Sequence, residues 1–152
     1  MGTLVMSDWT NKILIEAPPS ALGIKTFSCT TNTVFPGYPV TATGETDPDV
    51  VVIGAADDVA TGIALCKPNH DIDTAYAAGE FIPVALKGSG AVVWAFLKTA
   101  GGELVVGTPL HVDGTPTNYL VIGEGGLYEY IGKAVKYSAD QANDRPIQVR
   151  LR

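Results

Sequence analysis

Short apolar stretches separated by polar, Gly-containing turns fill the last hundred residues of the chain. The stretches at 50–53, 81–86 and 92–97 are four to six residues long and are bounded by turn residues, as strands are. The last stretch alternates Ile147, Val149 and Leu151 with polar residues, which is the period of a strand with one buried face. No segment sustains helical periodicity over the ~11 residues of an average helix. The pattern predicts an all-β fold, a small barrel (including a β-tulip-like one) or a sandwich.

The first third of the chain is less regular. Prolines at 18, 19, 36, 39 and 48 interrupt it, because proline removes a backbone donor and ends regular structure. Residues 12–16 could form one short strand, and the β-branched stretch at 26–34 predicts another. We therefore expect an extended N-terminal arm over 1–20 and a single β-rich domain over 21–152, with its regular core at about 50–152. We identify no internal repeat and attribute the likeness between 77–80 and 100–103 to shared turn chemistry.

Composition narrows the classes of partner. Charged residues make up 17% of the chain and apolar residues 46%, whereas soluble domains usually carry about a quarter charged residues. This deficit suggests that partners cover part of the surface. A net charge of −6 argues against nucleic acid, which requires a basic face. The apolar run at 91–97 is far shorter than the roughly 20 residues of a membrane span, and the N-terminus does not resemble a signal peptide, so we expect no membrane partner.

The titratable residues form no recognisable metal or catalytic motif. His70, Asp71 and Asp73 are potential ligands, but their spacing fits no calcium loop, and a solvated loop is the simpler interpretation. The same holds for the acidic pair at 57–58. Cys29 and Cys66 belong to no metal motif; free buried thiols are the default expectation, and a disulfide stays open.

Catalysis has little support either. His111 lies in a strand pattern, where a packed histidine is expected, and no Gly-x-Ser-x-Gly elbow is present. The segment at 87–90 resembles a phosphate loop only faintly, because a β stretch follows it instead of a helix. We expect a protein that is not an enzyme and that carries no cofactor and no metal.

Aromatic and apolar side chains are the better candidates for contact with partners. Tyr128 and Tyr130 fall on one face of a predicted strand, which suits a protein interface. Trp9 lies in the arm with little local core to join, so it is a candidate anchor, as are Ile13 and Ile15 in the short strand beside it. For Trp94 we favour ordinary core packing.

Beyond residue 50, the order of turns and strands resembles that of decoration (head-stabilising) proteins of tailed bacteriophages and related archaeal viruses. The resemblance covers roughly the two-thirds of the chain from 50 to 152. The stretches that carry it are Gly62-Ile63-Ala64, Ala77-Ala78-Gly79-Glu80, Ile82-Pro83-Val84, Gly101-Gly102-Glu103-Leu104, Gly107-Thr108-Pro109-Leu110, Ile131-Gly132-Lys133-Ala134-Val135 and Ile147-Gln148-Val149. The first fifty residues do not match it.

The resemblance implies a structural protein on the exterior of a virion, made in the host cytoplasm. It implies a homotrimer seated between capsomers, with the major capsid protein as its partner and an N-terminal arm that grips and stabilises the shell. An extended arm suits this role physically, because it can add a strand to a neighbouring sheet. The alternative is another structural β protein, such as a tail-tube, fibre or surface-layer subunit, or a non-catalytic binding module.

Overall fold

The computed structural model describes residues 13–30, 33–42, 50–53, 60–97, 103–112, 120–123, 130–139 and 145–152. Within them the regular elements are strands and one short 3₁₀ helix, so the all-β prediction is confirmed. The elements are β1 (Leu14–Glu16), η1 (Ala21–Gly23), β2 (Ile24–Cys29), β3 (Pro39–Ala42), β4 (Val50–Ile53), β5 (Gly62–Ala64), β6 (Phe81–Leu86), β7 (Val92–Leu97), β8 (Pro109–Val112), β9 (Leu120–Ile122), β10 (Tyr130–Ala134) and β11 (Arg145–Leu151).

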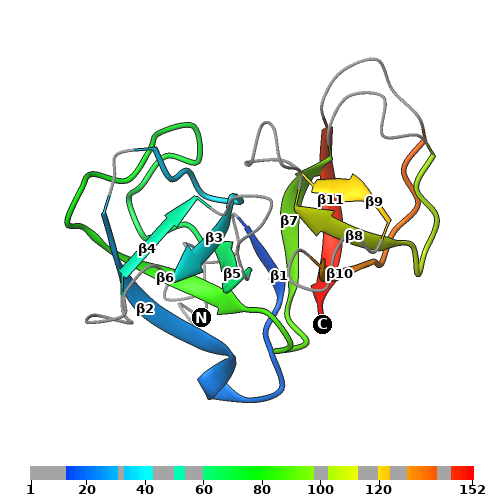
Figure 1. Ribbon diagram of the computed structural model, residues 1–152, viewed down its shortest axis with the longest axis horizontal. Coiled ribbons are helices and arrows are strands. Elements are labelled where there is room, and N and C mark those ends of the chain that lie inside the picture. The colour runs from blue at the N-terminus through cyan, green and yellow to red at the C-terminus, as the bar shows by residue number, and fades with distance from the viewer. Residues whose placement is uncertain are drawn as a thin grey trace, which may run out of the picture.

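The strands form two groups that lie side by side, β2–β6 and β7–β11 (Figure 1). The first group closes on itself in the order β2-β4-β3-β5-β6, and we call it the N-terminal ring. The second runs β7-β11-β10-β8-β9 and returns to β7 through the pair Leu97–Leu120; we call it the C-terminal ring. Regular structure thus includes β2 and β3, which precede residue 50.

The two rings have the same topology. In each, the first strand pairs in parallel with the third and antiparallel with the fifth. The second strand pairs antiparallel with the third and the fourth, and the fourth with the fifth. The chain therefore contains a structural repeat, and the expectation that it has none is wrong.

Turn residues mark the repeat in the sequence. Gly37-Tyr38-Pro39-Val40 returns as Gly107-Thr108-Pro109-Leu110, and both glycines have positive φ, 89° and 92°, a conformation that glycine adopts without strain. The Gly37 N–H donates to the Ala64 carbonyl at 2.7 Å, and the Gly107 N–H donates to Ala134 at 2.8 Å. Equivalent backbone hydrogen bonds thus close equivalent turns.

A second pair of equivalent positions, Gly62 and Gly132, requires glycine for a different reason, namely lack of space for a side chain. A Cβ on Gly62 would lie 2.1 Å from the carbonyl oxygen of Ala85, and one on Gly132 would lie 2.2 Å from that of Arg150. Neither position can hold a side chain without moving the backbone of the neighbouring strand. The repeat therefore depends on close backbone approach between its fourth and fifth strands.

Each ring encloses an apolar core. Phe27, Cys29, Val34, Val40, Ala64, Tyr76, Ile82 and Val84 form the core of the N-terminal ring. In the C-terminal ring, strand register places the equivalents of the six of these residues that lie in strands in the larger cluster, among them Leu97, Leu110, Ala134 and Val149. The two interiors are therefore filled at matching positions by different side chains.

The outer face of the N-terminal ring joins the rings together. Ile63, Leu65 and Ala85 alternate with inward-facing residues, yet they are fully buried and belong to the cluster of the C-terminal ring. The equivalents of Ile63 and Ala85 on the C-terminal ring are Lys133, which is exposed, and Arg150, which is half-buried. The same face is therefore apolar where the molecule covers it and charged where solvent reaches it.

The described end of the predicted arm is part of this junction. β1 pairs antiparallel with β7, beginning at Leu14, and the Trp94 N–H donates to the Ile13 carbonyl at 2.8 Å. The two terminal guanidinium nitrogens of Arg150, Nη1 and Nη2, each lie 3.3 Å from an oxygen of the Glu16 carboxylate. Residues 13–16 are thus fixed to the body of the molecule, and residues 1–12 lie outside the described part.

Candidate interaction surface

A groove crosses the C-terminal ring where the outer faces of β7 and β11 meet. One half, with a volume of about 290 Å³, is lined by Ile13, Ile72, Asp73, Trp94, Phe96 and Pro146. Trp94 and Phe96 reach it because Val93, Ala95 and Leu97 point into the ring core, so the side chains between them point outwards. This half of the groove is largely apolar.

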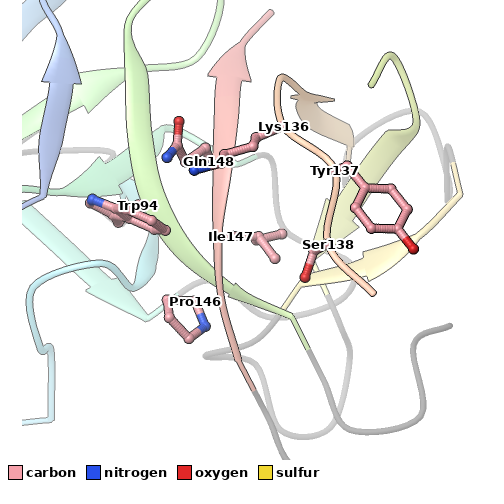
Figure 2. A pocket seen from close by; sticks show the side chains of 7 residues that line it. All are labelled: Trp94, Lys136, Tyr137, Ser138, Pro146, Ile147 and Gln148. Atoms are coloured by element: carbon pink, nitrogen blue, oxygen red, sulfur yellow. The ribbon is translucent and has the colours of Figure 1, made fainter. Parts of the chain in front are cut away.

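The other half continues past Trp94 and Pro146 towards the segment at 136–138 (Figure 2). Its volume is about 180 Å³, and its remaining lining residues are Lys136, Tyr137, Ser138, Ile147 and Gln148. Because the two halves share Trp94 and Pro146, we describe them as one groove, whose lining includes the acidic residue Asp73 in one half and the basic residue Lys136 in the other. Volumes at or below the low end of small-molecule sites suit side chains of a protein partner.

The predicted interface residues are placed unevenly. Ile13 is 2% exposed and packs inside its own chain, whereas Ile15 is 41% exposed. Tyr130 is half-buried, with the Lys87 ammonium 5.9 Å from its ring centre. Trp9 and Tyr128 lie outside the described residues. Ile13 contributes to the groove, whereas the described residues Ile15 and Tyr130 are not among its lining residues.

The histidines serve the local fold. The His70 ring stacks on Tyr76 with centroids 4.1 Å apart, and its Nε2 lies 2.6 Å from the Thr74 carbonyl oxygen. The Asp71 carboxylate accepts from the Asp73 N–H at 3.0 Å, which holds a turn. His111 Nδ1 lies 3.0 Å from the Gly123 carbonyl oxygen. Within the described ranges, no group of three or more His, Cys, Asp or Glu could hold a metal ion.

Tyr76 anchors the long loop between β5 and β6. Its hydroxyl donates to the Leu65 carbonyl and accepts from the Lys67 N–H. Burial is the main cause that raises the pKa of its phenol well above the ordinary value of 10.0. The Lys67 ammonium binds the Glu80 carboxylate, and this contact lowers the pKa of Glu80 below its ordinary value of 4.5. These groups form a structural clamp.

Cys29 and Cys66 are fully buried thiols that form no disulfide with each other, which confirms the default expectation. Cys29 belongs to the core of the N-terminal ring, and Cys66 belongs to the larger cluster, together with Ile63 and Leu65. The Cys66 thiol lies 3.2 Å from the His70 carbonyl oxygen.

Reasoning from the sequence missed the groove because it assigned Trp94 to the core. Trp94 does pack against the core cluster, but it is half-buried and its outer side lines the groove. The alternation in 92–97 was the available signal. It separates small and aliphatic side chains on one face from Trp94 and Phe96 on the other.

Comparison with known proteins gives a match to a solved structure. No family model matches the chain, and no curated protein matches its sequence. Among solved structures it is similar to the head fibre gp8.5 N base in bacteriophage phi29, with a TM-score of 0.50 and 14% sequence identity. The match covers 85% of this chain and 92% of that chain. The two proteins share a fold.

In the described part of the chain, no helix has the length and apolar character needed to cross a membrane.

Proposed function

We propose that this protein is a structural, non-catalytic component of a virion. It binds the outer surface of the viral shell and bridges neighbouring capsid subunits. The observation that carries the proposal is the fold shared with a phage head fibre base along most of both chains. The resemblance of residues 50–152 to phage decoration proteins supports the same role.

The surface chemistry supports a protein partner. The groove combines apolar lining residues with charged groups in its two halves, the kind of surface that orients a protein segment while burying its apolar side chains. In this proposal the partners are the major capsid protein and further copies of this chain, which form a homotrimer on the virion exterior. Residues preceding β1 act as the gripping arm.

A direct test is cosedimentation of the purified full-length protein with empty shells of the virus that encodes it. We expect saturable binding, and Trp94→Ala together with Pro146→Ala should weaken it at least tenfold by removing the shared wall of the groove. Leu22→Ala is the matched control, because Leu22 is an apolar residue that is 84% exposed and is not among the lining residues of either half. Failure of the full-length protein to bind the shells would refute the proposal.

Removing residues 1–12 tests the arm separately, because this deletion leaves β1 and its pairing with β7 in place. We expect weaker shell binding with unchanged thermal stability. If the protein without residues 1–12 binds the shells with full affinity, these residues do not act as a gripping arm.

A fibre base subunit is the second candidate, favoured by the identity of the structural neighbour. Electron microscopy of virions labelled on this protein separates the two functions. A decoration protein caps the shell, whereas a fibre base has a fibre rising from each labelled position.

A further inference from the structure

One turn of the C-terminal ring exposes two neighbouring valines. Val105 is 52% exposed and Val106 is 67% exposed, although turn tips usually carry Gly, Pro, Asn, Asp or Ser. A Cβ placed on the next residue, Gly107, would meet no atom within 4 Å. This turn, which we call the valine turn (Val105–Gly107), therefore presents an exposed apolar tip.

The repeat shows what such a turn does when it has a partner. The equivalent turn of the N-terminal ring is 35–37, where Pro36 and Gly37 are buried. A Cβ on Gly37 would lie 2.9 Å from the Phe96 ring and 3.5 Å from Ile13. The turn at 35–37 therefore packs on the side chain of Phe96, on the outer face of β7. We call such a receiving position a seat. Inside this molecule the turn at 35–37 is thus a docking element, and the valine turn is its exposed counterpart.

The corresponding seat on the N-terminal ring is also exposed. Strand register makes Ser28 equivalent to Phe96, and Phe81, which pairs with Ser28, equivalent to Pro146 beside the groove. Phe81 is 67% exposed. The Phe81 side chain therefore supplies an exposed apolar surface on β6, next to Ser28, which is the position equivalent to Phe96.

Access to this seat is open among the described residues. On the C-terminal ring, β1 covers the edge of β7 at Val92 and Val93. On the N-terminal ring, β2 pairs with β4 only at Ser28 and Cys29, and no described strand takes the place of β1 beside its earlier residues.

We propose that the valine turn of one copy docks on the Phe81 seat of a second copy. The two surfaces differ, so the contact is heterologous, and repeating it closes a ring of copies if the rotation permits. The inference rests on the internal repeat and is independent of any shell.

The contact is small and therefore weak in the free protein. The large apolar junction face of the N-terminal ring, which includes Ile63 and Ala85, is replaced on the C-terminal ring by Lys133 and Arg150. A second junction of the same kind cannot form, because it would bury those charges. The valine turn is still apolar, so it can make a weak contact between copies that are already held close together.

Disulfide trapping between different copies tests the contact. Val106→Cys protein is mixed with Phe81→Cys protein under mild oxidation, so a bond between the two engineered thiols must join two chains. The native thiols are fully buried and do not compete. We expect a heterotypic dimer at least fivefold more abundant than in a mixture of Val106→Cys with Leu22→Cys, a control at an even more exposed position.

Equal trapping in the two mixtures would overturn the proposal, as would trapping mainly between two Val106→Cys chains. Sedimentation of the untrapped protein gives an independent readout. Val106→Asp should abolish concentration-dependent association, and Leu22→Asp should leave it unchanged. Association that survives Val106→Asp would also contradict the proposal.

Discussion

Two glycines lie where neighbouring strands approach each other closely. Gly62 and Gly132 occupy the same place in their rings, each facing the carbonyl group of a neighbouring strand. A methyl group at either position would overlap that carbonyl oxygen, so the two strands would have to separate and their ladder hydrogen bonds would lengthen. These residues act through backbone proximity, since neither glycine has a positive φ.

Gly62→Ala and Gly132→Ala should each lower the free energy of unfolding by about 2–3 kcal/mol, the upper part of the range for overpacking. Gly107→Ala is the matched control, because it has open space and bears only the cost of its positive φ, about 1 kcal/mol. Urea denaturation measures all three. Equal losses at Gly132 and Gly107 would show that close approach is not the reason for the glycine.

Tyr76→Phe removes one hydroxyl that joins two backbone groups. The Leu65 carbonyl then lacks its donor, and the Lys67 N–H lacks its acceptor. Leaving buried polar groups unsatisfied should lower the free energy of unfolding by about 1–3 kcal/mol, again measured in urea. Tyr137→Phe is the control, because Tyr137 is 55% exposed and should change stability little.

At the scale of elements, the loop between β5 and β6 has its own clamp. The Lys67 ammonium contacts the Glu80 carboxylate and also donates to the Phe81 carbonyl at 2.9 Å. The Ala77 N–H donates to Glu80 at 3.0 Å. These contacts close the loop at the start of β6, beside the exposed side chain of Phe81.

This clamp makes a pH-dependent contribution to stability. The folded pKa of Glu80 lies below its ordinary value of 4.5, so the unfolded state takes up a proton first as the pH falls. The contribution is complete above pH 4.5 and is lost as the pH falls through the folded pKa. Glu80→Gln should therefore lose stability relative to the native protein at pH 7, and the difference should shrink towards pH 3. Glu103→Gln, at an exposed position, is the control for the loss of one carboxylate elsewhere in the chain.

At the scale of the whole molecule, the junction between the rings buries Ile63 and Ala85 of the N-terminal ring, whereas the equivalent residues of the C-terminal ring are the charged Lys133 and Arg150. The equivalent faces of the two rings therefore differ in both burial and charge. Ile63 and Lys133 occupy equivalent positions, but Ile63 is apolar and buried whereas Lys133 is charged and exposed. They therefore provide a matched test of the junction.

Ile63→Lys places a charge in the buried junction and should destabilise the protein by about 3–5 kcal/mol, the cost of an uncompensated buried charge. Lys133→Ile changes an exposed residue and should alter stability by less than about 0.5 kcal/mol. Thermal unfolding followed by circular dichroism distinguishes them. A mild effect of Ile63→Lys would mean that the rings are not held together through this face.

The sequence by itself determined the local features of the protein. The two-residue period of the strands, the glycine turns and the lack of helical periodicity were enough to predict an all-β fold, because those signals act between near neighbours. Gly37-Tyr38-Pro39 and Gly107-Thr108-Pro109 were also visible, seventy residues apart. The side chains between them differ so much that these short matches did not indicate a repeat.

Only the tertiary structure decided which strands pair and which faces are covered. Strand pairing joins residues far apart in the chain, and the same alternating pattern fits many pairings. The alternation placed Trp94 and Phe96 on one face of their strand, but it could not show that this face lies outside the ring core and forms a groove with Pro146. Nor could it show that the turn at Gly37 is seated while the turn at Gly107 is open. Burial depends on what the rest of the molecule places against a face, and a local pattern does not contain that information.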